Sequence, residues 1–382
     1  MKIVIAPDSY KESLSAREVA EEIRAGFRQV FPDADYLLIP VADGGEGTVQ
    51  AMIDATSGVL RTLAVSGPHG ELVQASYGLA ADQGLAIIEM ASASGLELVP
   101  AGRRNPLVTT SAGTGELIRD ALAAGARHIV IGIGGSATND GGAGMLQALG
   151  ARLTDADGRE LGPGGAELAR LAHLDASGLD PRLKTCRIDV ACDVSNPLTG
   201  PQGASRVFGP QKGATPGMVE TLDRCLARFA EVLKADLGQD VADIPGAGAA
   251  GGMGAALLGV LGASLRPGSE VVTEAVGLEQ ALAGADLVIT GEGRIDGQTI
   301  YGKTPIGVTR VAKRLGLPVI GLAGCLAQDA GVVHEHGIDA VFSSVHKACS
   351  LEEALRDARI NLRSVARNAA AAIRTGMTIA KR

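Results

Sequence analysis

Three carboxylates follow short apolar segments that are typical of buried parallel strands. Asp8 follows KIVIAP, Asp43 follows YLLIPVA, and Glu292 follows DLVIT with one glycine between them. Because the carboxyl ends of parallel strands meet at one edge of a sheet, where open α/β sheets bind their ligands, we expect these side chains to lie close together. Carboxylates in this arrangement can orient a reacting hydroxyl group or hold Mg²⁺.

Hydroxyl and cationic groups accompany these carboxylates. Ser9 and Lys11 follow Asp8, and Arg294 lies shortly after Glu292. We therefore expect an anionic substrate at this edge, with the cations offsetting its charge. The alternatives are ordinary ones: a carboxylate that caps a loop, a solvated lysine, or an arginine in a surface ion pair.

A second polar set follows the segment CRIDVAC. Asp193 comes directly after it, and Asn196, Arg206 and Lys212 come later in the chain. A carboxylate beside amide and cationic groups is suited to deprotonating a hydroxyl group or holding a metal ion. The pattern favours Asp193 as a catalytic residue, with a turn cap as the alternative, whereas Asp189 inside the strand is more typical of an internal ion pair.

The segment GIGGSA, residues 132–137, follows apolar residues and matches the dinucleotide-binding pattern G-x-G-x-x-A, with Asp155 placed to meet a ribose. A Rossmann helix should begin at the second glycine of the pattern, but residues 138–142 would then fill its first turns. These residues include the glycine pair 141–142, and each glycine costs a helix about 1 kcal/mol relative to alanine. The pattern favours a loop whose N–H groups bind another anion, over an NAD site or a purely structural turn. The candidate residues are Gly134, Gly135 and Ser136.

The segment GQTIYGKT, residues 297–304, matches the Walker A pattern G-x-x-x-x-G-K-T. In a P-loop the strand runs directly into the first glycine, whereas here we expect the strand to end at Thr290, with GEGRID intervening. We therefore do not expect a true P-loop. Lys303, at the start of a helix, could still meet a nucleotide phosphate.

Hydrophobic periodicity indicates the elements that position these residues. Apolar strands alternate with helical periodicity in the first sixty residues and after Asp286, and Ser15 with Glu18 forms a capping box. Between these regions, strands around the turn SGPHG alternate with period two, as in antiparallel or mixed sheets. We expect helices over residues 16–30, 48–57, 304–315 and 351–373.

This change of pattern predicts the domain organisation. The fold class is α/β, with a Rossmann-like discontinuous domain of residues 1–60 plus 270–382. A large second α/β domain, residues 61–269, is inserted into it.

Composition restricts the ligand. The chain has 382 residues, a net charge of −8, no Trp, and only four Tyr and five Phe, so nucleic acid and membrane partners are not expected. The uncharged segment 246–265 is long enough to span a bilayer, but its glycines favour a loop leading into a buried helix. Five scattered cysteines and the lack of a signal peptide predict a cytoplasmic protein with reduced thiols.

Seven blocks of the sequence together resemble the bacterial glycerate kinase family of type 1. They are PDSYKESLSA, PVADGGEGT, GIGGSATNDGGAGMLQALG, ACDVSNPLTG, VFGPQKGA, PGAGAAGGMGAAL and TGEGRIDGQT. The resemblance extends from Lys2 to about Gly376. It implies a kinase that uses ATP and Mg²⁺ to convert D-glycerate to 2-phosphoglycerate, on a Rossmann-like domain with a large α/β insertion.

We accordingly expect phosphoryl transfer to the C2 hydroxyl in an inter-domain cleft, with the roles assigned from residue chemistry. The predicted catalytic residues are Asp193, Asp43 and Lys11. The predicted substrate-binding residues are Asp8, Ser9, Lys11, Asn196 and Arg294. The predicted nucleotide-binding residues are Gly134, Gly135, Ser136, Lys212 and Lys303, and the predicted Mg²⁺ ligands are Asp8, Asp43 and Glu292.

Three alternatives stay open at this point. The first is a kinase that forms 3-phosphoglycerate or acts on a related hydroxy acid. The second is an NAD-dependent hydroxy-acid oxidoreductase that uses GIGGSA and Asp155. The third is a sensor that clamps a small anion between two domains without turning over ATP.

Overall fold

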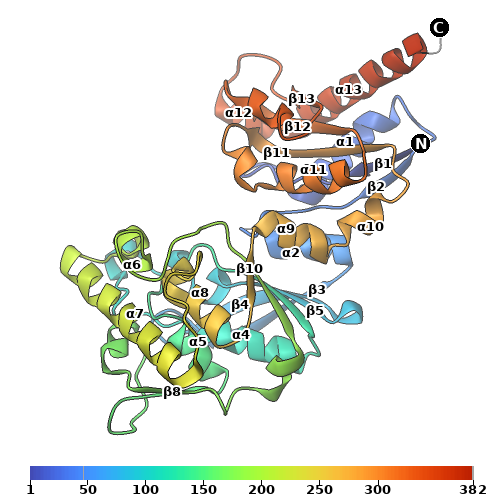
Figure 1. Ribbon diagram of the computed structural model, residues 1–382. Helices are drawn as coiled ribbons and strands as arrows, with labels where there is room; N and C mark the ends of the chain where they lie inside the picture. Colours follow the sequence, from blue (N-terminus) through green and yellow to red (C-terminus); the bar gives the residue numbers. More distant parts are fainter. Residues whose placement is uncertain (46, 381–382) are drawn as a thin grey trace. The chain divides into compact units, whose positions relative to one another are not determined.

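The computed structural model describes residues 1–45 and 47–380, which form two compact units (Figure 1). Unit 1 comprises Met1–Asp43, Gln50–Ser57 and the chain from Gly268 onward, and unit 2 comprises Gly44–Val49 and Gly58–Pro267. Unit 1 is therefore discontinuous in sequence, and most of unit 2 is inserted into it. Both units combine helices with parallel strands, so the predicted fold class is confirmed.

Unit 1 is built on a sheet of five parallel strands in the order β13-β12-β11-β1-β2. The strands are β1 (Lys2–Ile5), β2 (Asp35–Leu38), β11 (Leu287–Ile295), β12 (Val319–Leu326) and β13 (Ala340–Ser343). Ile3 of β1 pairs with Leu287 on one side and with Tyr36 on the other. A parallel strand with two neighbours is buried, which explains why β1 is apolar after its lysine.

The helices of unit 1 are α1 (Ala16–Arg28), α2 (Thr48–Thr56), α9 (Gly268–Ala275), α10 (Leu278–Leu282), α11 (Thr304–Arg314), α12 (Leu351–Arg356) and α13 (Ala358–Ala380). Helices α1, α11 and α13 pack on the strands of its sheet. The helices predicted near residues 16, 48 and 304 are confirmed. The single helix predicted over residues 351–373 was wrong, because the chain breaks at Asp357 between α12 and α13.

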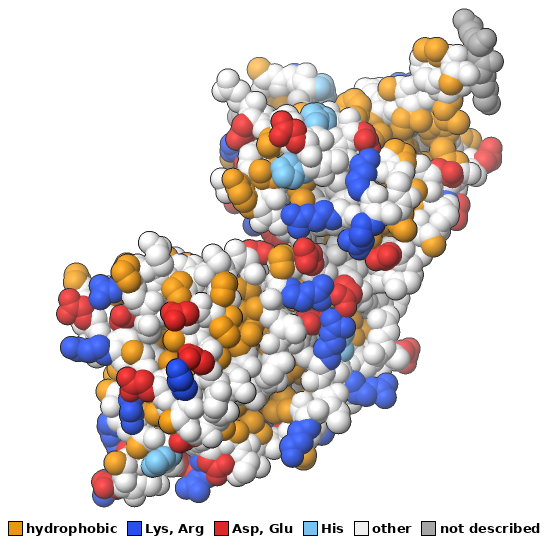
Figure 2. All heavy atoms as spheres, in the orientation of Figure 1, with side chains coloured by type: hydrophobic (Ala, Val, Ile, Leu, Met, Phe, Trp, Pro, Cys, Tyr) orange, Lys and Arg blue, Asp and Glu red, His pale blue; other side chains and the backbone are white. Residues whose placement is uncertain are grey.

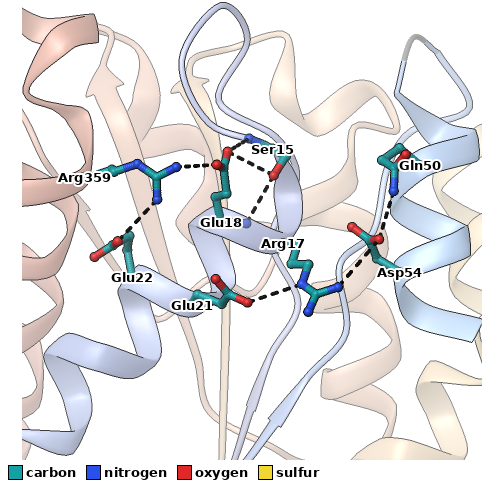
Figure 3. A network of polar contacts seen from close by, with 8 residues as sticks. All are labelled: Ser15, Arg17, Glu18, Glu21, Glu22, Gln50, Asp54 and Arg359. Atoms are coloured by element: carbon teal, nitrogen blue, oxygen red, sulfur yellow. Dashed lines mark hydrogen bonds and ion pairs between the residues drawn. The ribbon is translucent and has the colours of Figure 1, made fainter. Parts of the chain in front are cut away.

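Polar contacts attach α1 to its neighbours. The predicted capping box is present: the hydroxyl of Ser15 accepts from the N–H of Glu18 at 3.3 Å, and the carboxylate of Glu18 accepts from the N–H of Ser15 at 2.9 Å. Figure 3 shows Arg359 of α13 contacting Glu18, while Arg17 lies 3.9 Å from Asp54 of α2. Helix α1 is therefore held between α13 and α2.

Unit 2 contains a six-stranded sheet in the order β10-β9-β6-β5-β4-β3. The strands are β3 (Val59–Ser66), β4 (Leu72–Ala80), β5 (Leu85–Glu89), β6 (His128–Gly132), β9 (Arg187–Ala191) and β10 (Ser264–Arg266). The pairs β3/β4 and β4/β5 are antiparallel, as the period-two alternation predicted, and the other pairs are parallel. Two short strands, β7 (Arg152–Thr154) and β8 (His173–Asp175), form a separate ribbon.

The helices of unit 2 are α3 (Ala91–Ser94), α4 (Ala112–Ala123), α5 (Ala143–Ala148), α6 (Ala204–Phe208), α7 (Pro216–Leu237) and α8 (Ala249–Gly259). The glycine-rich segment 246–265 contains a loop that leads into buried α8, as predicted. Gly251 has a φ of +67°, and a Cβ there would lie 2.1 Å from the carbonyl oxygen of Thr138. Glycine is thus required where α8 touches the loop after β6. Among the described residues, no helix is long and apolar enough to cross a membrane.

Candidate active site at two sheet edges

The side chain of Asp8 lies just beyond the carboxyl end of β1 in unit 1. Its Oδ1 accepts a hydrogen bond from the N–H of Ser9 at 2.6 Å. Its Oδ2 accepts one from the hydroxyl of Thr304, the first residue of α11, at 2.5 Å. Burial raises the pKa of Asp8 to about 6, although both hydrogen-bond partners favour the charged form, and the nearby charge of Asp43 raises it further.

Glu292 lies within β11 rather than after a strand, and it is largely buried. It accepts a hydrogen bond from the hydroxyl of Thr299 at 2.6 Å, and the ammonium of Lys303 lies 3.4 Å away. Burial raises the pKa of Glu292 to about 7, and the charge of Asp8 adds to this effect. The electrostatic coupling of Asp8 to both Asp43 and Glu292 shows that the three predicted carboxylates lie near one another.

The Walker A-like segment has a different setting from the one expected. Strand β11 does not end at Thr290 but continues to Ile295, because GEGRI pairs with β12. Gly297 thus follows closely after the strand, and the segment does connect a strand to a helix. Lys303 contacts Glu292 and Asp296, however, at 3.4 and 3.6 Å. In this structure the lysine neutralises carboxylates at the sheet edge.

Two predicted substrate-binding cations lie at the surface of the same edge. The backbone of Gly293 in β11 lies against that of Tyr10 and Lys11, since a Cβ on Gly293 would be 3.4 and 3.5 Å from their atoms. Lys11 is exposed, and the exposed guanidinium of Arg294 lies 3.3 Å from Asp296. Unit 1 therefore brings together Asp8, Ser9, Lys11, Asp43, Glu292, Arg294 and Lys303 at one rim.

The loop 132–137 follows β6 at the carboxyl edge of the sheet in unit 2. Gly134 and Gly135 are exposed, and Gly135 has a φ of +72°. The carbonyl of Gly135 accepts from the N–H of Leu96 at 2.8 Å, and that of Ser94 accepts from the N–H of Ala137 at 2.9 Å. Among the described residues, none accepts a hydrogen bond from the N–H groups of residues 134–136. These donors are available to an anion.

Lys212 supports this loop from inside the protein. It is only 1% exposed, and its ammonium group lies 2.6 Å from both the hydroxyl of Ser136 and the carbonyl oxygen of Thr138. Burial lowers the pKa of Lys212 to about 7, against the opposing effect of Asp140. Lys212 therefore holds the loop in shape, and its predicted contact with a nucleotide stays a prediction.

A pocket of about 600 Å³ lies beside the loop. Gly134 and Gly135 form part of its wall, and the segment 91–98 forms another part. Two carboxylates, Glu89 and Glu97, also line it. Glu89 ends β5, and its carboxylate accepts from the N–H of Val49 at the start of α2 at 2.9 Å.

Asp193 and Asn196 lie after β9, the strand next to β6 in the same sheet. Asp193 is exposed, whereas the amide of Asn196 donates to the carbonyl of Gln202 at 2.7 Å and so closes a turn. Asp189 forms the expected internal pairs, with His128 at 2.8 Å and Arg187 at 2.7 Å. The pocket beside the loop does not include Asp193 or Asn196 among its described lining residues.

The geometry argues against the dinucleotide alternative. Helix α5 begins only at Ala143, well after the glycines where a Rossmann helix would start. Asp155 accepts from the N–H groups of Asp157 and Arg159, both at 3.0 Å, and pairs with Arg170 at 2.5 Å. Its carboxylate caps a turn.

Sequence reasoning missed Glu89, Glu97 and Thr304. Glu89 could have been found, because it ends the apolar segment LAIIE in the same way that acidic residues follow the other strands. Thr304 was visible only as a letter of the Walker A pattern. Glu97 lies in a short 3₁₀ turn, Leu96–Leu98, and carries no sequence signal.

The oxygen and nitrogen donors of the described side chains determine how Mg²⁺ could bind. Within the described residues, no group of three or more His, Cys, Asp or Glu side chains could hold a metal ion. Mg²⁺ commonly binds through one or two carboxylates together with substrate phosphates and water. Asp8 and Glu292 fit that mode, because burial raises the pKa of each carboxyl, the charge of a neighbouring carboxylate raises it further, and a cation would favour the charged forms.

Comparisons with known proteins agree over the whole chain. The model of the glycerate kinase family matches residues 3–374. The chain is 63% identical to glycerate 2-kinase of Escherichia coli K12 and 57% identical to glycerate kinase of Bacillus subtilis 168, each alignment covering 99% of both chains. A crystal structure of a protein assigned as glycerate kinase 2, from Salmonella typhimurium LT2, matches with a TM-score of 0.92 and 61% identity over 99% of both chains. The chain therefore belongs to the glycerate kinase family of enzymes.

Proposed function

We propose that this enzyme transfers the γ-phosphoryl group of ATP to the C2 hydroxyl of D-glycerate, giving 2-phosphoglycerate, ADP and a proton. The observation that carries the choice of product is the 63% identity, over 99% of both chains, to a protein named glycerate 2-kinase. The two sheet edges supply what such a transfer needs: anion-binding N–H groups in unit 2, and carboxylates beside cations in unit 1.

The roles follow from the chemistry of each group. The C2 oxygen attacks the γ-phosphorus, the bond from that phosphorus to the bridging oxygen breaks, and Asp193 accepts the hydroxyl proton. Lys11 and Arg294, both exposed, bind the carboxylate of glycerate. Asp43 is the second candidate for the proton acceptor. The N–H groups of Gly134, Gly135 and Ser136 bind phosphate oxygens, which stabilises charge without rearrangement of the loop.

Asp8 and Glu292 are the residues that would hold Mg²⁺ together with the nucleotide. The ion would supply charge neutralisation on the transferred phosphoryl group. Ser9 and Thr304 orient the carboxylate of Asp8 by donating to its two oxygens. Lys303 has the complementary task of limiting repulsion between Glu292 and Asp296.

The decisive experiment is ³¹P NMR of the product formed from D-glycerate, ATP and Mg²⁺. A 2-phosphoglycerate signal is expected. A 3-phosphoglycerate signal would keep the kinase but overturn the proposed seating of the acid. If no phosphorylated acid is formed, the substrate is a related hydroxy acid or the protein binds its ligand without phosphoryl transfer.

We also propose that residues 1–60 with 270–382 and residues 61–269 act as two domains that enclose the substrates in a cleft. Transfer in a closed cleft excludes water that would otherwise hydrolyse ATP. Small-angle X-ray scattering with D-glycerate and a non-hydrolysable ATP analogue should show a smaller radius of gyration than the free protein. An unchanged radius would contradict closure.

We propose the cytoplasm as the site of action. The support is that all five cysteines are free thiols, which is the usual state in a reducing compartment. Cell fractionation would locate the enzyme, and recovery from an exported fraction would contradict this proposal.

A further inference from the structure

The pocket beside the loop 132–137 has more room than glycerate needs. Its volume of about 600 Å³ falls within the range of roughly 300–1,000 Å³ that is typical of sites for larger small molecules. The proposed function supplies two ligands, a three-carbon acid and a nucleotide. Size alone therefore favours the nucleotide as the occupant, and this inference rests on the proposed function.

The charges in the pocket indicate which part of the nucleotide enters it. Glu89 and Glu97 contribute carboxylates to the lining, and none of its described lining residues is Lys, Arg or His. Phosphates beside these two carboxylates would be repelled, as would the carboxylate of glycerate. A neutral group with hydroxyl donors fits better, because carboxylates accept hydrogen bonds from sugar hydroxyls, as they do in dinucleotide sites.

The walls complete this picture. Ala91, Leu96 and Leu98 give the pocket apolar surface against which a base can pack. The same segment is tied to the phosphate-binding loop, since the N–H of Leu96 donates to the carbonyl of Gly135 at 2.8 Å. The backbone of the apolar wall and the N–H groups of the loop are therefore held next to each other.

We propose that this pocket binds the adenosine half of ATP, with a ribose hydroxyl donating to the carboxylate of Glu97. The base lies against Ala91, Leu96 and Leu98, and the phosphates extend over Gly134 and Gly135. Glu97 is chosen over Glu89 because the carboxylate of Glu89 already accepts from Val49. Glu97 is exposed on the 3₁₀ turn Leu96–Leu98 and is free to meet a ligand.

The test compares ATP with 2′-deoxy-ATP and 3′-deoxy-ATP, by calorimetric binding and by kcat/KM with D-glycerate. Glu97→Gln is compared with the wild type and with Glu220→Gln, an equally conservative change at an exposed position on α7. We expect the wild type and Glu220→Gln to prefer ATP over one deoxy-nucleotide by about tenfold, as for loss of one charge-assisted hydrogen bond. In Glu97→Gln this preference should shrink to about two-fold or less, through weaker binding of ATP and of the deoxy-nucleotide that keeps the contacting hydroxyl, while binding of the other deoxy-nucleotide stays unchanged.

Two results would overturn the inference. One is a wild type that binds and uses both deoxy-nucleotides as well as ATP. The other is a Glu97→Gln variant that keeps the full preference or weakens all three nucleotides equally. Absence of any phosphoryl transfer to D-glycerate in the wild type would instead overturn the proposed function. The calorimetric binding data would still test whether the pocket binds the adenosine half of ATP.

Discussion

The two sheet edges use opposite means to meet charged ligands. In unit 1 the edge presents side chains: Asp8 and Glu292 are largely buried, and hydroxyls and Lys303 surround them. In unit 2 the edge presents backbone: exposed glycines offer N–H groups, and the buried Lys212 contacts the same loop through Ser136 and Thr138. A side-chain site can be altered by one substitution without disturbing the chain path, whereas a backbone site depends on whatever fixes the loop.

Asp193→Asn should have the largest effect on catalysis, because Asp193 is the proposed proton acceptor. It lies after β9, at the sheet edge of unit 2. We expect kcat to fall by about 10²–10⁴-fold, with the KM values for ATP and D-glycerate changed little. Steady-state kinetics of this variant and of Asp43→Asn would be measured together. A near-normal kcat for Asp193→Asn, with a larger loss in Asp43→Asn, would assign the proton acceptor to Asp43 in unit 1.

Lys212→Met should both destabilise the protein and weaken ATP binding. It leaves the hydroxyl of Ser136 and the carbonyl of Thr138 without their buried donor, at a cost of about 1–3 kcal/mol in the free energy of unfolding. Denaturant unfolding and the KM for ATP would be measured. A stable variant with an unchanged KM would show that the loop does not depend on Lys212.

The effect of Lys212→Met on stability should depend on pH. The pKa of Lys212 is about 7 in the folded protein and 10.5 for the ordinary side chain, so between these values the unfolded chain binds a proton that the folded protein does not. The stability of the wild type relative to Lys212→Met should therefore rise as the pH increases from about 7 toward 10. Denaturant unfolding of both proteins at pH 7 and pH 9.5 checks this sign, and a stability difference that is equal at both pH values would contradict it.

Gly134→Ala should act on the ligand rather than on the fold. Among the described residues, apart from Gly134 and its two chain neighbours, no atom lies within 4 Å of a Cβ placed at Gly134. We expect a phosphate bound to the loop to lie closer than that. We expect the KM for ATP to rise about tenfold, with unfolding unchanged, since a displaced contact of about 1.4 kcal/mol corresponds to that factor. Gly217→Ala is the control, because Cβ at this exposed position on α7 also has open space. An equal KM for ATP in the two variants would contradict the proposal that a phosphate binds at this loop.

Ser15→Ala should have the smallest effect and leave the chemistry intact. Removing the cap of α1 should cost about 1 kcal/mol of stability without changing the kinetic constants. A change in KM for glycerate would show that the position of α1 is coupled to the rim of unit 1. Thermal unfolding and steady-state kinetics would distinguish these outcomes.

Most predicted helices and strands are confirmed, because residues close together in the sequence are sufficient to specify them. Ser15 and Glu18 are three residues apart, which is sufficient for a capping box, and KIVI is apolar enough for a buried strand. The end of β11 was mispredicted because GEGRI contains two glycines and two charges, and only its pairing with β12 makes it a strand. Local propensity gives way to tertiary pairing in such segments.

The sequence by itself determined the α/β class, the acidic and glycine-rich strand ends, and the family. These depend on residue type and on spacing along the chain, which a linear pattern records. Only the tertiary structure decided that Lys212 lies under the loop after β6, that Thr304 donates to Asp8, and that Glu89 and Glu97 line a pocket. Each of these contacts joins segments that are distant in sequence or whose side-chain directions are set by packing. Neither property can be inferred from the order of the residues alone.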